Sequence, residues 1–529
     1  SEYLGMKEFA SCVLAVLVVT ATRLVWASVS GMEVSLYVFL DSAAIYYYIR
    51  YSLSHSRKRF LAPMLAAAAA TARPELFLLP VFFLLHQFAL RRKTKSTKHV
   101  KQKEVRAALS SKLFLPANEL IKQGAVFVLC SAPFFALNFS LSGDILPLTF
   151  TAKTAGRGLS SLLDQGDIGE IFRRSFLGLW VANNDAFAWL WAPDNMFLAV
   201  VAIAAFIVIA VHWWRKGVHS QMERIMLLLA IMFFLFAPIR SVVTGSLDFG
   251  QFGRYAAYLT PAMILLGAYG IYSWLGRREI ANPRLFLIVT AAVNILLLII
   301  FYSTPGYFGM GHQWPSMNWY QAFLDQRNGT DILLFGALII AVTALADILL
   351  RKEYSVDKLF AFLLLQCLCF AVVENVQVAA EYGWDVKNIN DTQVEIGGWL
   401  AKNTPPGTVY ATNDIGAMPF YATQDTLVDV MGLVSPEVAA IRETGVPPDM
   451  MCLWLLRKHH PQYLVCFNEW FPRLTHDGIP FGLLTPVHSV IINNNLTCGG
   501  PNTSAMYVYK VNYNLLSDFI TQNQIKLPE

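Results

Sequence analysis

The sequence predicts a many-span (polytopic) α-helical membrane protein that ends in a soluble α/β domain. Of its 529 residues, 55% are hydrophobic and 15% are charged, whereas an ordinary soluble protein has about 25% charged residues. Apolar runs long enough to cross a bilayer recur as far as residue 376, and a strongly basic stretch separates two of them. The composition then turns polar and rich in short strand patterns. We therefore predict a transmembrane helical domain over residues 1–376 and an α/β domain over residues 377–529.

The basic stretch, residues 91–122, sets the expected orientation of the chain. It has ten Lys and Arg residues against two Glu, and a connection this basic between apolar segments stays on the cytoplasmic side. The connections at 215–216, 277–278 and 351–352 are also basic, and they fall on the same side by alternation. The α/β domain is then expected outside the cytoplasm. Because the basic residues lie in short connections, the net charge of +5 does not indicate a nucleic-acid partner.

Eleven spans follow from the apolar runs. The short runs 60–71 and 76–90 are expected to form a hairpin whose tip points outward. Residues 162–180 have the pattern of an amphipathic helix lying along the membrane interface. The eleven runs are 8–27, 32–51, 60–71, 76–90, 124–141, 196–214, 225–243, 255–275, 285–302, 332–350 and 359–376.

The predicted α/β domain mixes strands and helices. Runs rich in Val, Ile and Tyr predict strands at 408–414, 425–432, 462–467, 488–495 and 505–513. Helices are expected at 395–403 and 448–459. The cysteines of this region, Cys452, Cys466 and Cys498, allow at most one disulfide, and the chain has no CxxC pair or other metal-binding motif.

Charged residues at the outer ends of the spans are the first candidates for function, because charge at a membrane boundary is costly. Glu33 lies at the outer start of a span, where it either caps the helix or faces a cavity. Arg73 and Glu75 flank Pro74 at the hairpin tip. Glu75 suits the first turn of a helix, but Arg73 gains nothing there. The structural alternative for Arg73 is an ion pair with Glu75 or Glu33.

Two further segments suit a phosphate group. Lys153 follows a turn and several hydroxyl-bearing residues just outside a span, and Lys and Arg in such places bind phosphate. The alternative for Lys153 is contact with lipid headgroups. Arg254, with Tyr255, precedes a span on its outer side, against the positive-inside trend, so an anionic partner explains it better. Arg240 joins Arg254 from the preceding span, and Asp248 lies on the connection between them.

Several function classes are excluded by the motifs that the sequence lacks. It has no GxxxxGK[ST] loop, no dinucleotide-binding glycine fingerprint and no HExxH. A lipid-phosphate substrate fits instead, since its tail can stay in the bilayer while its head reaches the polar outer boundary.

Four motifs in order resemble those of the bacterial GT-C glycosyltransferases. They are SGME at 30–33, ARPE at 72–75, GDILPLTFTAK at 143–153 and GRYAAYLTP at 253–261. Residues 412–437 are similar to the soluble domain of the same group, so the resemblance covers nearly the whole chain. More distantly, it resembles protein mannosyltransferases and mycobacterial arabinofuranosyltransferases.

The resemblance implies a GT-C-like fold and an enzyme of the bacterial cytoplasmic membrane. Such an enzyme moves a sugar from a polyprenyl-phosphate carrier to a glycan, lipid or protein acceptor on the outer face. Lys153 and Arg254, helped by Arg240 and Tyr255, would meet the donor phosphate. The cavity would be shaped by Glu33, Arg73, Glu75 and Asp248. The carrier is a substrate and no cofactor is implied; a divalent metal is left open.

The chain departs from this family at the catalytic acid. The family's catalytic Asp lies in the first external loop, which would precede Ser1 here, and Asp41 is a poor substitute because it lies in mid-span. An N-terminal fragment or other membrane subunits would then be partners. Two alternatives stay open: a non-catalytic scaffold subunit of a larger complex, and a transporter of lipid-linked sugars.

Overall fold

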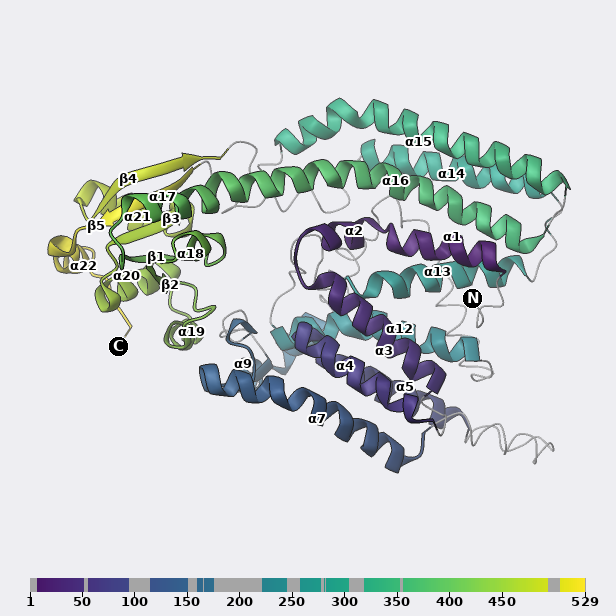
Figure 1. Ribbon diagram of the computed structural model, residues 1–529, viewed down its shortest axis with the longest axis horizontal. Coiled ribbons are helices and arrows are strands. Elements are labelled where there is room, and N and C mark those ends of the chain that lie inside the picture. Colours follow the sequence, from purple (N-terminus) through teal and green to yellow (C-terminus); the bar gives the residue numbers. More distant parts are fainter. Residues whose placement is uncertain are drawn as a thin grey trace.

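The computed structural model shows a helical bundle joined by one long helix to an α/β domain (Figure 1). The residues that the structure describes are 7–51, 56–94, 115–150, 159–164, 166–175, 221–244, 257–276, 280, 282–303, 318–352, 355–492 and 505–528. The chain is mostly helical. The helices of the bundle are α1 (Glu8–Val19), α2 (Thr22–Val29), α3 (Val34–Tyr51), α4 (Leu61–Ala72), α5 (Leu79–Thr94), α7 (Ala117–Ser142), α9 (Leu159–Asp164), α12 (Gln221–Thr244), α13 (Leu259–Leu275), α14 (Pro283–Ser303), α15 (Asn318–Lys352) and α16 (Val356–Ile389).

The apolar helices make the chain a membrane protein. Among the described residues, Ala117–Ser142, Glu223–Val243 and Leu333–Arg351 are long and apolar enough to cross a membrane, judged by length and composition alone. Shorter apolar helices include Glu8–Val19 and Leu259–Leu275. The predicted run 196–214 lies outside the described residues, and the total of eleven spans stays a prediction.

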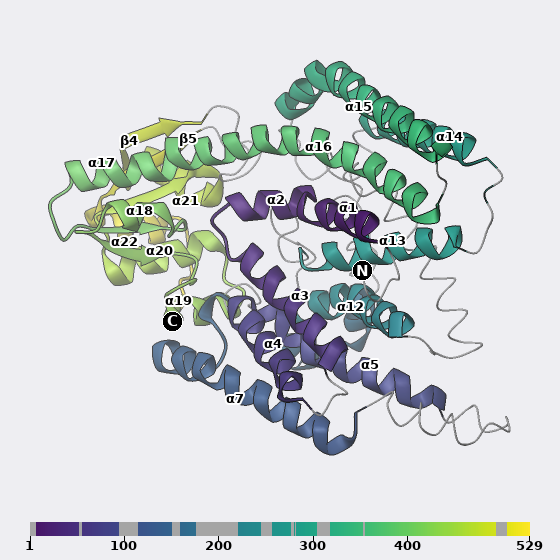
Figure 2. The same ribbon diagram turned by 45° about the vertical axis from the view of Figure 1, so that its right-hand side comes forward.

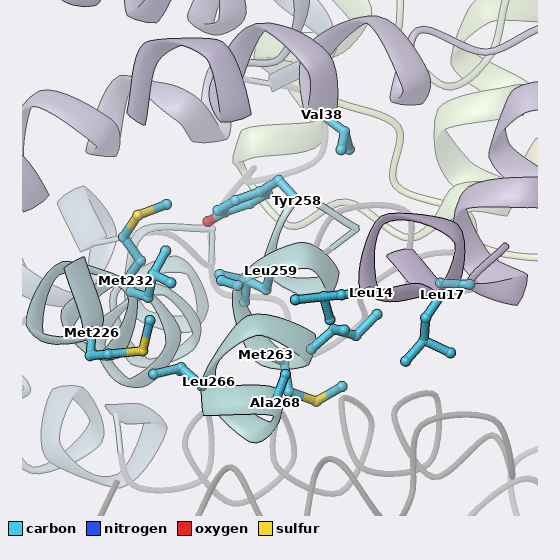
Figure 3. Close-up of a cluster of buried hydrophobic side chains, with 14 of the residues drawn as sticks. Leu14, Leu17, Val38, Met226, Met232, Tyr258, Leu259, Met263, Leu266 and Ala268 are labelled. Carbon is cyan, nitrogen blue, oxygen red and sulfur yellow. The ribbon is translucent and has the colours of Figure 1, made fainter. Parts of the chain in front are cut away.

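The centre of the bundle is packed from α1, α3, α12 and α13. Leu14 and Leu17 of α1 face Leu259 and Met263 of α13, with Met232 of α12 on the other side (Figure 3). Tyr258, just before α13, contacts the rings of Tyr37 and Phe236 edge-on, with ring centroids 6.3 Å and 4.9 Å apart. The apolar core therefore extends from α1 to α12 through α13.

The bundle has two chemically different ends. At one end Arg59 pairs with Glu119 at 3.2 Å, and a buried network joins Tyr48, His86 and Gln87. The Tyr48 hydroxyl lies 2.8 Å from His86 Nδ1, and it accepts a hydrogen bond from the Gln87 amide at 2.7 Å. We call this the basic end, because the predicted basic stretch begins there. The opposite end, which faces the α/β domain, is called the domain end.

The first predicted span, 8–27, is wrong as a single helix. The helix stops at Thr20 and Ala21 and restarts as α2. The side-chain amide of Asn375 on α16 donates to the Thr20 carbonyl at 2.7 Å, so the carbonyl freed by the break keeps a donor. A backbone group in lipid needs such a partner. Further along, the Tyr382 hydroxyl donates to the Val29 carbonyl at 2.6 Å. α16 thus holds both halves of the broken helix.

α16 is longer than the predicted span 359–376. Its 34 residues extend about 50 Å at 1.5 Å per residue, which exceeds a hydrocarbon core of about 30 Å. It passes through the predicted domain division at residue 376 without a break, and both views show it running into the α/β domain (Figures 1 and 2). A π-helical turn, Asn390–Val394, then leads to α17 (Glu395–Asn403).

The α/β domain is built on one five-stranded sheet, in the order β2-β1-β3-β5-β4. Four of the five predicted strand regions contain a strand, and the fifth, 488–495, overlaps a strand that begins earlier, at Leu484. The two predicted helices are confirmed as α17 and α20 (Pro448–His459). The strands are β1 (Val409–Thr412), β2 (Thr426–Asp429), β3 (Tyr463–Phe467), β4 (Leu484–Ile491) and β5 (Ala505–Val511). β1 is parallel to β2 and β3, whereas β5 is antiparallel to β3 and β4. The remaining helices are α18 (Ala417–Tyr421), α19 (Pro436–Glu443), α21 (Pro472–Phe481) and α22 (Leu516–Gln522).

The parallel strands direct their carboxyl ends toward the junction with α16. The Gln393 amide in the π-helical turn donates to the carboxylate of Asp414, which follows β1. After β2, the Asp429 carboxylate accepts hydrogen bonds from three backbone amides, those of Met431, Gly432 and Val434. Loops at this edge of the sheet therefore face the bundle. Cys452 and Cys466 are buried free thiols in this domain, and Cys498 lies outside the described residues.

Replacing Asn375 with Ala should destabilise the bundle by about 1–3 kcal/mol, because the Thr20 carbonyl loses its donor. Thermal unfolding in detergent micelles measures this. Tyr382→Phe is the control: it removes an exposed hydrogen bond and should cost less than about 1 kcal/mol. Equal stability of the Asn375→Ala protein and the wild type would contradict this account of the break.

Gly432→Ala should unfold the α/β domain at lower temperature than Gly407→Ala. Both glycines have positive φ, +71° and +84°. An added Cβ at Gly432 would lie 2.6 Å from the Ala439 nitrogen, whereas nothing lies within 4 Å at Gly407. The left-handed backbone alone should lower the free energy of unfolding by about 1–2 kcal/mol in both variants, and the close contact should lower it further in Gly432→Ala. Thermal unfolding of the full chain measures the difference.

Candidate functional site

The candidate site lies at the domain end of the bundle and begins with an ion pair between Arg73 and Glu33. Glu33 precedes α3, where its carbonyl accepts the first helical hydrogen bond, from the Tyr37 amide at 3.0 Å. Arg73 ends α4 in an extended conformation, and Pro74 starts the short helix η2 (Pro74–Leu78) directly after it. Of the two partners predicted for Arg73, the structure selects Glu33. The Arg73 guanidinium also lies over the Tyr37 ring, 5.8 Å from its centroid.

Tyr258 is the centre of the site. Its side chain is 2% exposed, and its hydroxyl has no hydrogen-bond partner among the described residues. Asp41, Tyr37, Glu75 and Arg240 act electrostatically on this hydroxyl, and the Tyr37 ring contacts the Tyr258 ring. Segments far apart in the sequence therefore place acidic, basic and phenolic groups around one buried point.

Asp41 forms the inner limit of the site. It follows Glu33 and Tyr37 on the same face of α3, at steps of four residues. The eight residues from Glu33 correspond to about 12 Å along the helix. Asp41 is 1% exposed, and neither carboxylate oxygen has a hydrogen-bond partner in the described part of the chain. A buried carboxyl without partners is costly, so Asp41 is a functional candidate despite its mid-span position.

Arg240 joins the site from α12. It is 5% exposed, close to the end of that helix. The neighbouring Ser241 hydroxyl donates to the Arg174 carbonyl at 3.0 Å, which ties α12 to the short helical segment 168–175. The predicted amphipathic stretch 162–180 is thus helical at 159–164 and 168–175, and its last residues lie outside the described ranges.

The segment 168–175 has its own charge cluster. The Glu170 carboxylate accepts hydrogen bonds from Arg173 at 2.5 Å and from Arg174 at 2.7 Å. These bonds, with that from Arg173 the stronger influence, lower the pKa of Glu170 to about 2. The segment therefore keeps its carboxylate ionised across the physiological pH range, beside the domain end of α12.

The structure brings together four of the eight predicted site residues: Glu33, Arg73, Glu75 and Arg240. The other four, Lys153, Asp248, Arg254 and Tyr255, lie outside the described residues.

Sequence reasoning did not select Tyr37, Asp41 or Tyr258 as site residues. The four-residue spacing from Glu33 was a signal for Tyr37 and Asp41. Tyr258 lies within the motif at 253–261, but nothing local distinguished it from Tyr255. Among the described residues, no group of three His, Cys, Asp or Glu side chains could hold a metal ion.

Comparison with known proteins gives two findings. Residues 387–523 match the family model of a domain of unknown function, DUF8728, and no curated protein matches the chain. Among solved structures, the crystal structure of ArnT from Cupriavidus metallidurans bound to undecaprenyl phosphate resembles this chain at 11% identity. The TM-score is 0.49, and the alignment covers 95% of this chain and 79% of that chain. A TM-score below 0.5 does not establish a shared fold.

Removing either partner of the Arg73–Glu33 pair should destabilise the domain end of the bundle. The Arg73 side chain is only 13% exposed, so we expect a coupling free energy of about 1–2 kcal/mol, between the exposed and the buried extremes. A double-mutant cycle with Glu33→Gln and Arg73→Met, followed by thermal unfolding, measures it. The exposed pair Lys387–Asp391 is the matched control, with a coupling of about 0.5 kcal/mol or less. Coupling at Arg73–Glu33 no larger than in the control would contradict the assignment.

Proposed function

We propose that this protein is a membrane glycosyltransferase that moves a sugar from a polyprenyl-phosphate carrier to an acceptor hydroxyl. The observation that carries the proposal is the cluster of Glu33, Arg73, Glu75, Arg240 and Tyr258. Acidic and basic side chains meet at one end of an apolar bundle, next to a soluble domain (Figure 1). A substrate with a long apolar tail and a charged head suits this setting. Three of the four motifs that resemble GT-C glycosyltransferases, at 30–33, 72–75 and 253–261, contribute directly to the cluster.

The proposed chemistry is a direct displacement at the anomeric carbon. A carboxylate of the site takes the proton of the acceptor hydroxyl. The acceptor oxygen then displaces polyprenyl phosphate, and cations stabilise the leaving group. Arg240 supplies one cation from α12, and we assign the others to Lys153 and Arg254, with Tyr255 as a hydrogen-bond donor. Asp248, with the Arg73–Glu33 pair, would shape the sugar-binding cavity.

The proposed location is the outer face of the bacterial cytoplasmic membrane. The basic stretch at 91–122 supports this orientation, because it emerges from the end of the bundle opposite the site. The α/β domain would then lie outside the cytoplasm, where a glycan, lipid or protein acceptor can approach it.

Lys153→Ala and Arg254→Ala should each reduce sugar transfer by about 10²–10³-fold, the usual effect of removing a group that stabilises developing charge. The assay uses purified protein in lipid nanodiscs with a panel of radiolabelled polyprenyl-phosphate sugars. Lys387→Ala, which removes an exposed cation outside the site, is the control and should keep full activity. Full activity in both variants would remove the two phosphate assignments. Movement of labelled carrier between leaflets without transfer would favour the transporter instead.

A further inference from the structure

Three carboxyl groups of the described residues lie in the cluster, and they differ in their availability. Glu33 is engaged, because its carboxylate is the ion-pair partner of Arg73. Its carboxylate cannot turn toward an acceptor hydroxyl without breaking this ion pair. The role that the structure gives Glu33 is therefore to fix Arg73 over the Tyr37 ring.

Asp41 is excluded by its depth. It lies about 12 Å from Glu33 along α3, it is 1% exposed, and its neighbours on the buried face are Val38 and Ala44. A hydroxyl of a polar acceptor that enters from the domain end meets Glu33 and Glu75 long before it reaches Asp41. Asp41 therefore acts on Tyr258 from beneath and not on an acceptor.

Glu75 is neither held in an ion pair among the described residues, as Glu33 is, nor deeply buried, as Asp41 is. It lies two residues beyond Arg73, so it is level with the ion pair at the domain end. Its side chain is partly exposed, while its Oε2 atom is buried and has no hydrogen-bond partner in the described part of the chain. Pro74 before it and the buried Leu76 after it fix its backbone. The carboxylate thus extends from a defined backbone position, is partly exposed, and has no ion-pair partner among the described residues.

Glu75 belongs to the group of side chains around the buried Tyr258 hydroxyl. Glu75 and Asp41 both act electrostatically on this hydroxyl. Neither the Tyr258 hydroxyl nor Glu75 Oε2 has a hydrogen-bond partner among the described residues. A base is effective when a second group holds it in position, and we assign this positioning role to Tyr258.

We propose that Glu75 is the general base of the transfer, an inference that rests on the proposed function. Glu75 takes the proton of the acceptor hydroxyl, and the acceptor oxygen forms a bond to the anomeric carbon of the donor sugar. The bond between that carbon and the phosphate oxygen breaks, and polyprenyl phosphate leaves with the electron pair. The catalytic base would then lie in the segment that joins α4 to α5.

Glu75→Gln should reduce transfer by about 10²–10⁴-fold, the range for loss of a general base. The affinity for polyprenyl phosphate, measured as quenching of intrinsic tryptophan fluorescence in nanodiscs, should stay within about twofold of wild type, since the base does not hold the phosphate. Sodium formate should restore part of the activity of Glu75→Ala, because a small external carboxylate can replace the missing one. Glu33→Gln should not respond to formate.

Two variants keep the proposal testable if Glu75→Gln folds poorly. Glu75→Asp retains the carboxylate at a shorter reach and should keep more activity than Glu75→Ala. Tyr258→Phe should reduce the turnover number, and it should add no further loss to Glu75→Gln, because residues that act as a unit have non-additive effects.

The outcomes separate this proposal from the function on which it rests. If the wild type transfers sugar and Glu75→Gln is equally active, Glu75 is not the base. If Asp248→Asn abolishes turnover and responds to external formate while Glu75→Ala does not, the base is Asp248. If the wild type uses no polyprenyl-phosphate sugar, although it binds polyprenyl phosphate, the proposed function falls and the assignment of Glu75 falls with it.

Discussion

The Asn375 amide on the Thr20 carbonyl is the interaction on which the arrangement of the bundle depends. A chain in lipid cannot leave a backbone carbonyl without a donor, and the break between α1 and α2 creates one. Because α16 supplies the donor, the chain can change direction there and deliver the motif at 30–33 to the domain end. The Tyr382 hydroxyl then fixes the end of α2 at Val29. These two contacts hold both ends of α2, which leads into the segment that carries Glu33.

The site shows how a membrane protein keeps charge within an apolar bundle. Arg73 and Glu33 neutralise one another and remain partly exposed, so each retains some hydration. Glu75 and Arg240 extend the cluster toward the buried Tyr258. Burial of ionisable groups on this scale costs stability, and proteins retain such groups where function needs them. Nothing in the packing of the core, which is continuous on either side, requires them at this point.

The sequence predicted the α/β domain better than the bundle. Strands and amphipathic helices of an α/β domain have local patterns. Four of the five strands and both helices lie within the predicted ranges, and β4 begins earlier than predicted. The break at Thr20 had no local sign, since neither Gly nor Pro occurs there, and the donor that satisfies its carbonyl, Asn375, is more than 350 residues away. Arg73 was predicted to have one of two partners, and only the fold could choose Glu33. Tyr258 was missed for the same reason, because its importance comes from residues on other helices.

The π-helical turn at 390–394 is the one irregular element between α16 and the sheet, and the Gln393 amide binds Asp414 from within it. Because α16 is otherwise a continuous and therefore rigid helix, it restricts movement of the sheet relative to the bundle. Any tilt of the domain must either distort this single wide turn or rotate α16 as a whole. Because Asn375 and Tyr382 of α16 bond to Thr20 and Val29, a rotation of α16 would displace α2. The position of the α/β domain is therefore coupled mechanically to the start of α3.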